Sequence, residues 1–404
     1  MVIELSNIFN SVLTNSLFRN KNVLQASYTP SSILHREKQI EIIASILAPS
    51  LRGEKTSNLF LYGKTGTGKT LSVLYVKEEL LKKAKEINVN LLIEYLNCKL
   101  KKVSDTEYRI LASLIEQLGG SIPATGLPTQ QVYNKFIELI DSKKQLIILI
   151  LDEVDQIVKK ISDSFLYSLL RLNSELSKSQ ISIIGISNDV TFLDNIDPRV
   201  RSSLGEEEIL FPPYNALQLQ DILKERCHLA FKENVVDEAV ISKCAALAAR
   251  EHGDARRALD LLRIAGELAE REGKKLINLE HLDMANEKIE RDKILDLVET
   301  QPIQCQLVLY SIVLLTKQKE NEKSKVFFTG DVYNTYQNLC KKLKLEVLTQ
   351  RRVSDIIADF DMFGLINAVV ISKGRHGRTR EIKLSIPKNI IDKIEEILRT
   401  QLSL

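Results

Sequence analysis

Eight residues, Gly63-Lys64-Thr65-Gly66-Thr67-Gly68-Lys69-Thr70, form a glycine-rich motif between the apolar run 58–62 and the helical pattern 71–76. A strand before and a helix after are the context of a phosphate-binding loop rather than of a chance glycine-rich turn. Glycines let backbone N–H groups converge on phosphate oxygens. In such a loop the lysine reaches the β- and γ-phosphates, and the final hydroxyl ligates Mg²⁺.

We therefore expect ATP or ADP to bind here with Mg²⁺. The expected contacts come from the glycines and polar residues of the motif, Gly63, Gly66, Thr67, Gly68, Lys69 and Thr70.

The apolar run 146–151 contains six aliphatic residues and ends in Asp152 and Glu153. An unbroken aliphatic run of this length predicts a buried parallel strand. Carboxylates at its C-terminal end lie where open α/β sheets bind ligands. We predict that Asp152 joins Thr70 in holding Mg²⁺ and that Glu153 orients or deprotonates the attacking water. A solvated acidic turn is the alternative.

Two further sites follow along the chain. The buried run 181–187 ends in Asn188, whose neutral amide can bind the γ-phosphate or the water beside Asp152. Next come Arg199 and Arg201, which suit an arginine finger on the γ-phosphate of a neighbouring protomer. We rank Arg199 ahead of Arg201, and a surface salt-bridge pair remains the alternative for both.

Beyond Pro212 and Pro213 the pattern is helical, with apolar spacing over 216–230, 236–250, 254–270 and 279–290. Asn215 and Asp254 are placed to start helices. Arg256, in the first turn after Asp254, can swing onto the nucleotide if this helical domain closes as a lid.

These motifs resemble the AAA+ ATPase family over about residues 25–290. Within it they are most similar to archaeal origin-recognition proteins, which are related to origin recognition complex subunits and to the cell-division-control helicase loader. The resemblance rests on Tyr28-Thr29-Pro30, on His35-Arg36-Glu37-Lys38-Gln39, on the run 197–204 and on Phe211-Pro212-Pro213-Tyr214-Asn215. It implies that His35 and Arg36 pack around the adenine, and that Tyr214 and Arg226 contact the nucleotide.

The segment 98–141 carries two helical patterns, 105–118 and 129–141, joined by a Gly- and Pro-containing linker. Initiators of the AAA+ family resemble this, because they carry an extra helical element here that touches DNA. Lys99, Lys101, Lys102 and Arg109 give the segment a basic edge. A solvated helix pair is an equally open interpretation.

Residues 300–404 carry 17 Lys and Arg against 11 Asp and Glu, whereas the rest of the chain carries 39 against 42. A basic module of this kind is typical of nucleic-acid binding. Helical patterns at 304–316, 330–344 and 350–362 precede two apolar strands, 365–371 and 380–386, which bracket a basic glycine-containing hairpin. This order of elements predicts a winged helix-turn-helix.

Two groups of residues in this module are expected to contact DNA. Gln350, Arg351 and Arg352 lie in the first exposed turn of the third helix, where a recognition helix meets base edges. On the wing, Lys373, Arg375, Arg378 and Arg380 can reach phosphate or the minor groove. Plain surface charge and a protein-binding wing are the alternatives.

The composition sets limits on the class of protein. With 404 residues and 44% apolar content the chain can form two or three domains. No apolar run reaches the roughly 18 residues that span a bilayer, and no signal-peptide pattern is present, so we expect a cytoplasmic, nucleoid-associated protein without membrane contact. The five cysteines form no C-x-x-C pair, and we expect no metal besides Mg²⁺.

The sequence thus predicts an α/β P-loop AAA+ core with a parallel five-stranded sheet (1–212, with an N-terminal extension at 1–25), an all-α lid domain (213–295) and a C-terminal winged helix-turn-helix (300–404). The resemblance implies an ATP-dependent replication initiator that binds double-stranded origin DNA and helps to recruit or load the replicative helicase, with other initiator protomers as further partners. Hydrolysis would be weak and act as a switch. The alternative is a DNA-binding regulator with a bound, largely non-cycling nucleotide; a clamp-loader-like motor is disfavoured because the basic wing replaces a collar domain.

Overall fold

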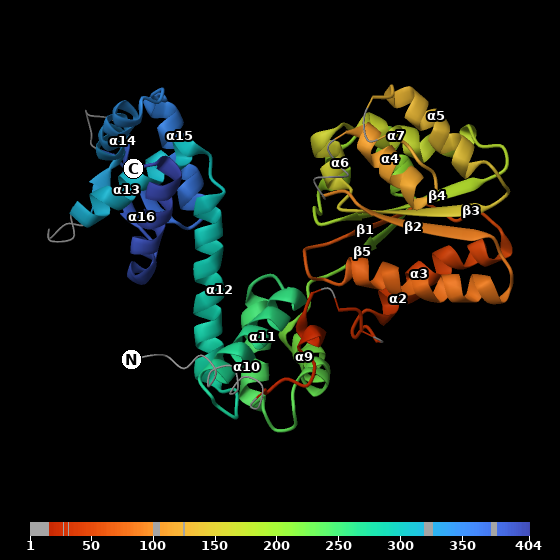
Figure 1. Ribbon diagram of the computed structural model, residues 1–404, viewed down its shortest axis with the longest axis horizontal. Helices are drawn as coiled ribbons and strands as arrows, with labels where there is room; N and C mark the ends of the chain where they lie inside the picture. The colour runs from red at the N-terminus through yellow and green to blue at the C-terminus, as the bar shows by residue number, and fades with distance from the viewer. Residues whose placement is uncertain are drawn as a thin grey trace. The chain divides into compact units, whose positions relative to one another are not determined.

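The computed structural model of the chain describes residues 16–26, 28–30, 32–99, 106–123, 126–318, 326–372 and 378–404. The chain divides into two compact units between Asp283 and Met284. Figure 1 shows the elements of both units, which are taken in turn below.

The first unit is built around a five-stranded parallel sheet with the order β2-β3-β4-β1-β5. Its strands are β1 (Leu59–Tyr62), β2 (Leu91–Asn97), β3 (Leu146–Asp152), β4 (Gln180–Ser187) and β5 (Glu207–Leu210). All seven residues of β3 are buried, as expected for an aliphatic strand covered on both faces. The register pairs Asn97 with Asp152 and Asp152 with Ile186, so the C-terminal ends of three neighbouring strands are level.

Helices cover both faces of this sheet (Figure 1). On one face α2 (Glu37–Leu47) and α3 (Lys69–Glu86) bury an apolar cluster against Leu59, Leu61 and Ile150. The other face is covered by α4 (Glu107–Gln117), α5 (Thr129–Ile140), α6 (Asp155–Lys160), α7 (Asp163–Arg171) and α8 (Pro198–Leu204). The short 3-10 turns η2 (Ala48–Arg52), η3 (Leu172–Ser174) and η4 (Phe192–Asn195) complete this core, whereas η1 (Lys21–Leu24) packs against the later helices α9 (Ala216–Ala230) and α11 (Ala255–Arg271).

The lid consists of α9 (Ala216–Ala230), α10 (Glu238–Arg250), α11 (Ala255–Arg271) and the start of α12 (Leu279–Glu299). Asn215 caps α9 through a reciprocal bond with Gln218, and Asp254 caps α11. The expected helix at 279–290 is longer in the structure, because neither glycine nor proline interrupts the chain before Pro302. Helix α12 therefore crosses the boundary between the two units.

The second unit contains α13 (Ile303–Gln318), α14 (Thr329–Leu343), α15 (Gln350–Met362) and α16 (Lys388–Leu402), together with an antiparallel sheet of order β6-β8-β7. Its strands are β6 (Phe327–Phe328), β7 (Ile366–Ser372) and β8 (Arg378–Leu384). The apolar stripe of α15 is buried against this sheet, which gives the predicted winged helix-turn-helix. Helix α16 was not predicted; its Ile394 and Leu398 complete the core of the unit.

None of the helices in the described part of the chain is both long and apolar enough to cross a lipid bilayer.

Candidate functional site

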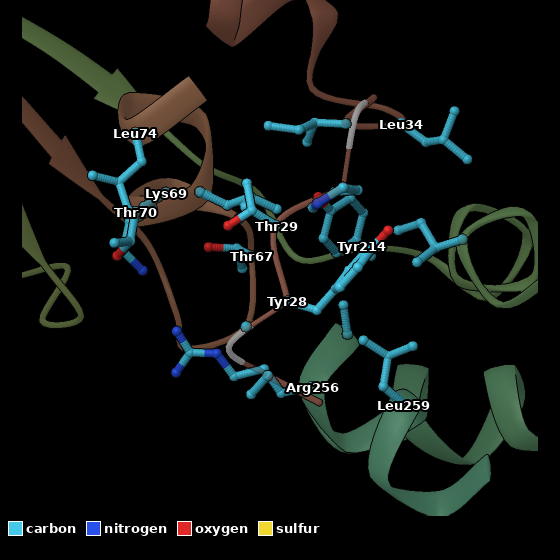
Figure 2. A pocket seen from close by; sticks show the side chains of 18 of the residues that line it. Tyr28, Thr29, Leu34, Thr67, Lys69, Thr70, Leu74, Tyr214, Arg256 and Leu259 are labelled. Atoms are coloured by element: carbon cyan, nitrogen blue, oxygen red, sulfur yellow. The ribbon is translucent and has the colours of Figure 1, made fainter. Parts of the chain in front are cut away.

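A cavity of about 390 Å³ opens at the C-terminal edge of the parallel sheet, between the P-loop and the lid (Figure 2). Position and size fit a ligand site of an open α/β sheet. Four parts of the first unit line it: the described N-terminal residues 25–26, 28–30 and 32–34, the P-loop with α3, the strand ends and the lid. The apolar part of the wall comes from Ile33, Leu34, Leu74, Ile222 and Leu259.

The P-loop has the backbone that its glycines require. Gly66 and Gly68 have φ angles of 68° and 90°, a left-handed conformation that costs other residues energy. A Cβ at Gly66 would lie 1.7 Å from Asp254 Oδ1, and one at Gly68 would lie 2.9 Å from the Tyr214 hydroxyl. The loop therefore touches the lid closely at two points. Gly63 lies at the base of the loop, against Phe211.

The Lys69 ammonium is held at the mouth of this loop. It donates to Gly63 O and Lys64 O at 2.7 Å each and to Asn188 Oδ1 at 2.9 Å. Burial lowers the pKa of Lys69 to about 8, because the charged form loses water. A phosphate entering the cavity would supply the negative charge that this ammonium lacks.

The oxygens expected to hold Mg²⁺ lie together. Thr70 Oγ1 donates to Asp152 Oδ2 at 2.9 Å, and the Tyr95 hydroxyl donates to the same oxygen at 2.8 Å. Asp152 Oδ1 accepts the Glu153 amide at 2.9 Å. A hydroxyl and a carboxylate at this separation are the donor set of a nucleotide-bound Mg²⁺, which prefers oxygen ligands. Thr70 and Asp152 thus fit the ion.

Glu153 and Asn188 both line the same cavity. Glu153 has a φ of 54°, an uncommon left-handed conformation for a residue other than glycine. Its carboxylate lies 3.5 Å from the Lys99 ammonium, which comes from the end of β2. As expected from parallel pairing of β3 with β4, Asn188 lies beside Asp152 at the strand ends.

Three lid residues named from the sequence also line the cavity: Tyr214, Arg226 and Arg256. Arg226 is buried; its guanidinium lies 4.6 Å from the ring of Tyr28 and donates to Val23 O. Burial lowers the pKa of Arg226. Arg256 extends from the first turn of α11 toward the P-loop side of the cavity, as Figure 2 shows.

His35 and Arg36 require a correction, because neither lines the cavity. His35 Nε2 lies 2.9 Å from Asp221 Oδ2 on the first lid helix. The Arg36 side chain points behind the P-loop and donates to backbone carbonyls there. The lining expected from them comes instead from the residues just before, Tyr28 to Leu34.

The arginine pair of α8 lies outside the residues that line the cavity. Arg199 pairs with Asp197 at 2.8 Å and stacks on the ring of Tyr167. Arg201 pairs with Asp194 at 3.0 Å. More than half of each arginine side chain is exposed, at 68% and 52%. These contacts match the alternative of surface salt bridges, and the arginine-finger role of either residue stays a prediction.

Tyr95 and Asn97 were not predicted from the sequence, although both line the cavity. The signal was available in the strand register. Asn97 is the last residue of β2 and pairs with Asp152, and Tyr95 stands two residues before it on the same face of the sheet. A search for polar residues at the end of the strand next to the acidic strand would have found Tyr95 and Asn97.

The basic edge of the insertion is only partly described. Lys101 and Lys102 lie outside the described residues, Lys99 pairs with Glu153 and Arg109 is exposed in the first turn of α4.

In the second unit the expected DNA-contact residues of α15 are exposed. Thr349 caps the helix by accepting the Arg352 amide, so Gln350, Arg351 and Arg352 form its first turn. Gln350 and Arg351 line a groove together with the start of α14 and parts of β7 and β8. No carboxylate belongs to the described lining of this groove, so it suits an anionic ligand.

The wing is described in part. Lys373 and Arg375 lie outside the described residues, and so does the side chain of Arg378, whose backbone opens β8. Arg380 lines the groove beside Arg351, and its contact with DNA stays a prediction. Its Nη1 donates to the carbonyl and hydroxyl oxygens of Ser354 on α15, so it ties the wing to the recognition helix.

Comparisons with known proteins agree with this architecture. Residues 52–189 match the family model described as AAA domain. Residues 220–287 match the Cdc6 AAA+ ATPase-type lid domain, and residues 296–394 match the CDC6, C terminal winged helix domain.

Similar proteins span nearly the full length. The ORC1-type DNA replication protein of Thermococcus onnurineus is 51% identical over 387 residues, covering 95% of this chain and 92% of the relative. That of Pyrococcus furiosus is 49% identical over 407 residues, covering 100% of this chain and 94% of the relative. Among solved structures, the Aeropyrum pernix ORC1 protein in complex with DNA has a TM-score of 0.80 at 41% identity, covering 95% of this chain and 97% of that chain.

Proposed function

Because the chain belongs to the family of ORC1-type DNA replication proteins, we propose that it binds double-stranded origin DNA in an ATP-dependent manner and helps to recruit or load the replicative helicase. One observation carries the proposal. One cavity is lined by the P-loop, by the acidic end of β3, by the amide of Asn188 and by Arg256 of the lid. The same chain contains a winged helix in which Arg351 and Arg352 are exposed.

ATP or ADP is the proposed ligand of the cavity. Thr70 and Asp152 would hold Mg²⁺, which when bound neutralises charge on the phosphates. Lys69 donates to the phosphates from the loop, and Arg256 reaches them from the lid. Glu153 orients the attacking water, while the neutral amide of Asn188 adds a hydrogen bond without repelling the phosphate.

Hydrolysis is proposed to be slow and to act as a switch. In the single chain the Glu153 carboxylate faces Lys99, and Arg199 and Arg201 face away from the cavity. A neighbouring initiator protomer would have to supply the arginine that stabilises the transition state. The same geometry favours the second candidate, a promoter or origin repressor whose nucleotide is bound but hardly turned over.

DNA is the proposed ligand of the winged helix. The relative from Aeropyrum pernix was solved as a complex with DNA, and its 41% identity supports a similar role here. Gln350, Arg351 and Arg352 would meet base edges or phosphates, and Arg380 would hold α15 against the wing.

The proposal is tested on the intact chain by measuring four quantities: nucleotide binding, ATP hydrolysis, affinity for an origin duplex, and retention of purified replicative helicase on that duplex. Lys69→Ala should abolish nucleotide binding and helicase retention while most DNA affinity remains. Glu153→Gln should bind ATP and retain the helicase but hydrolyse little. Lys82→Ala, an exposed change on the same helix α3, is the matched control. Equal loss of nucleotide and DNA binding in Lys69→Ala would contradict the modular assignment, and helicase retention independent of nucleotide would favour the repressor.

A further inference from the structure

Arg36 is a buried cation whose hydrogen-bond partners are all neutral. Its side chain is 2% exposed, and no ion pair within the described residues includes it. Nε donates to Thr67 O at 2.7 Å, Nη1 to His35 O at 2.9 Å and Nη2 to Pro212 O at 2.6 Å. Burial lowers the pKa of the guanidinium.

A buried charge is costly unless its surroundings satisfy it. Here the planar fork of the guanidinium satisfies carbonyls that come from three parts of the chain, and one face lies 3.8 Å from the ring centroid of Tyr214. A lysine ammonium has no planar face to stack on the Tyr214 ring while it donates to all three carbonyls. The arrangement therefore needs arginine specifically.

The partners of Arg36 belong to the two parts that must act on a nucleotide together. Thr67 lies in the P-loop, whereas Pro212 and Tyr214 lie in the link between core and lid. The Tyr214 hydroxyl packs against Gly68, and the Tyr214 amide donates to Gly253 O at 3.3 Å.

From Gly253 the path continues directly into the lid helix. The next residue, Asp254, caps α11 by accepting the amides of Arg256 and Arg257. At the same point the Ala255 amide donates to Gly66 O in the P-loop at 3.2 Å. A continuous series of contacts thus runs from Arg36 to the first turn of α11, where Arg256 lies.

We propose that Arg36 is a positioning residue that couples the phosphate loop to the lid, so that a nucleotide on the loop and Arg256 on the lid act as one binding unit. This rests on the proposed binding of ADP or ATP in the cavity. Arg36 does not itself line the cavity, so its effect on the nucleotide is transmitted through Thr67, Pro212 and Tyr214.

A double-mutant cycle separates this role from a purely structural one. In the intact chain, affinity for a fluorescent ADP analogue is measured for the wild type, Arg36→Met, Arg256→Ala and the double variant. Arg256→Ala should weaken binding about ten- to a hundredfold, the effect of one lost charge-assisted hydrogen bond. If Arg36 positions Arg256, the second substitution should change the affinity of Arg36→Met by less than threefold.

If the fold-losses in ADP affinity of the two single variants multiply in the double variant, their free energies add, as they do for independent residues. That result would overturn the inference. The matched control is Leu166→Ala, a buried change in α7 away from the cavity, which should lower the melting temperature yet leave the effect of Arg256→Ala unchanged. Should Arg36→Met not fold, Arg36→Lys enters the same cycle with the same criterion. Failure of the wild type to bind the analogue would contradict the proposed function instead.

Discussion

Replacing Gly66 with alanine tests the contact between the P-loop and the lid. Gly66 and Gly53 both have left-handed backbones, with φ angles of 68° and 76°. Alanine in this conformation costs about 1–2 kcal/mol at either position. The surroundings differ, because a Cβ at Gly53 meets nothing within 4 Å, whereas one at Gly66 would lie 1.7 Å from Asp254 Oδ1. Gly53→Ala is therefore the matched control.

The added Cβ at Gly66 must displace the Asp254 side chain. Asp254 accepts the amides of Arg256 and Arg257 as the N-cap of α11, and losing such a cap costs about 1 kcal/mol. We expect Gly66→Ala to lower the free energy of unfolding by about 2–3 kcal/mol in total, against about 1–2 kcal/mol for Gly53→Ala.

The same displacement moves Arg256, which follows Asp254 by two residues. Losing a charge-assisted hydrogen bond of about 1.5–3 kcal/mol would weaken ADP binding about ten- to a hundredfold. Urea unfolding followed by circular dichroism gives the stabilities, and titration with a fluorescent ADP analogue gives the affinities. Equal destabilisation of the two variants, with ADP affinity unchanged in both, would refute the proposed role of the loop–lid contact.

Three further results are expected. ADP affinity should fall about tenfold per pH unit above pH 8, because phosphate binding needs the charged form of Lys69, whose pKa burial lowers to about 8. In Lys69→Arg the affinity should not change over this pH range. A wild-type affinity that does not change with pH in direct titrations would contradict the role of Lys69 in phosphate binding. Tyr95→Phe removes one hydrogen bond from Asp152, the proposed Mg²⁺ ligand, and should therefore slow Mg-ATP hydrolysis about three- to tenfold. ADP binding in EDTA, where no Mg²⁺ is available, should be unchanged. Loss of ADP binding in EDTA would contradict the role of Tyr95 at the Mg²⁺ site. Duplex binding by Arg351→Ala and Arg352→Ala is measured in anisotropy titrations at several salt concentrations. Each lost phosphate contact should lower the magnitude of the slope of log affinity against log salt concentration by about one, and each lost base contact should reduce the preference for the correct base by about 1–3 kcal/mol. If neither quantity changes, α15 does not contact DNA.

The sequence predicts the position of a site residue best where that residue belongs to a short local motif. Lys69 and Thr70 open α3 directly after the P-loop, whereas Asp152 ends β3 and Asn188 follows β4, so the P-loop motif and parallel pairing bring them to one edge of the sheet. The predicted AAA+ core, lid and winged helix are confirmed for the same reason, because each follows from periodicity and local motifs.

The role of Arg36 could not be predicted in this way. Its partners Thr67 and Pro212 are separated by 145 positions and meet only in the folded unit, so no local pattern shows that Arg36 binds these carbonyls and does not line the cavity. Arg380 is a similar case. Its sequence context is a basic wing, but the register of β7 and β8 and the position of Ser354 turn the side chain toward α15.

The most direct test of the proposed function is to map where the intact protein binds on its own chromosome and to compare it with the Arg351→Ala, Arg352→Ala double variant. We expect sharp peaks at replication start sites that the double variant loses while its level in the cell stays the same. Peaks that lie mainly at promoters, away from any start site, would contradict the initiator assignment and favour a DNA-binding regulator.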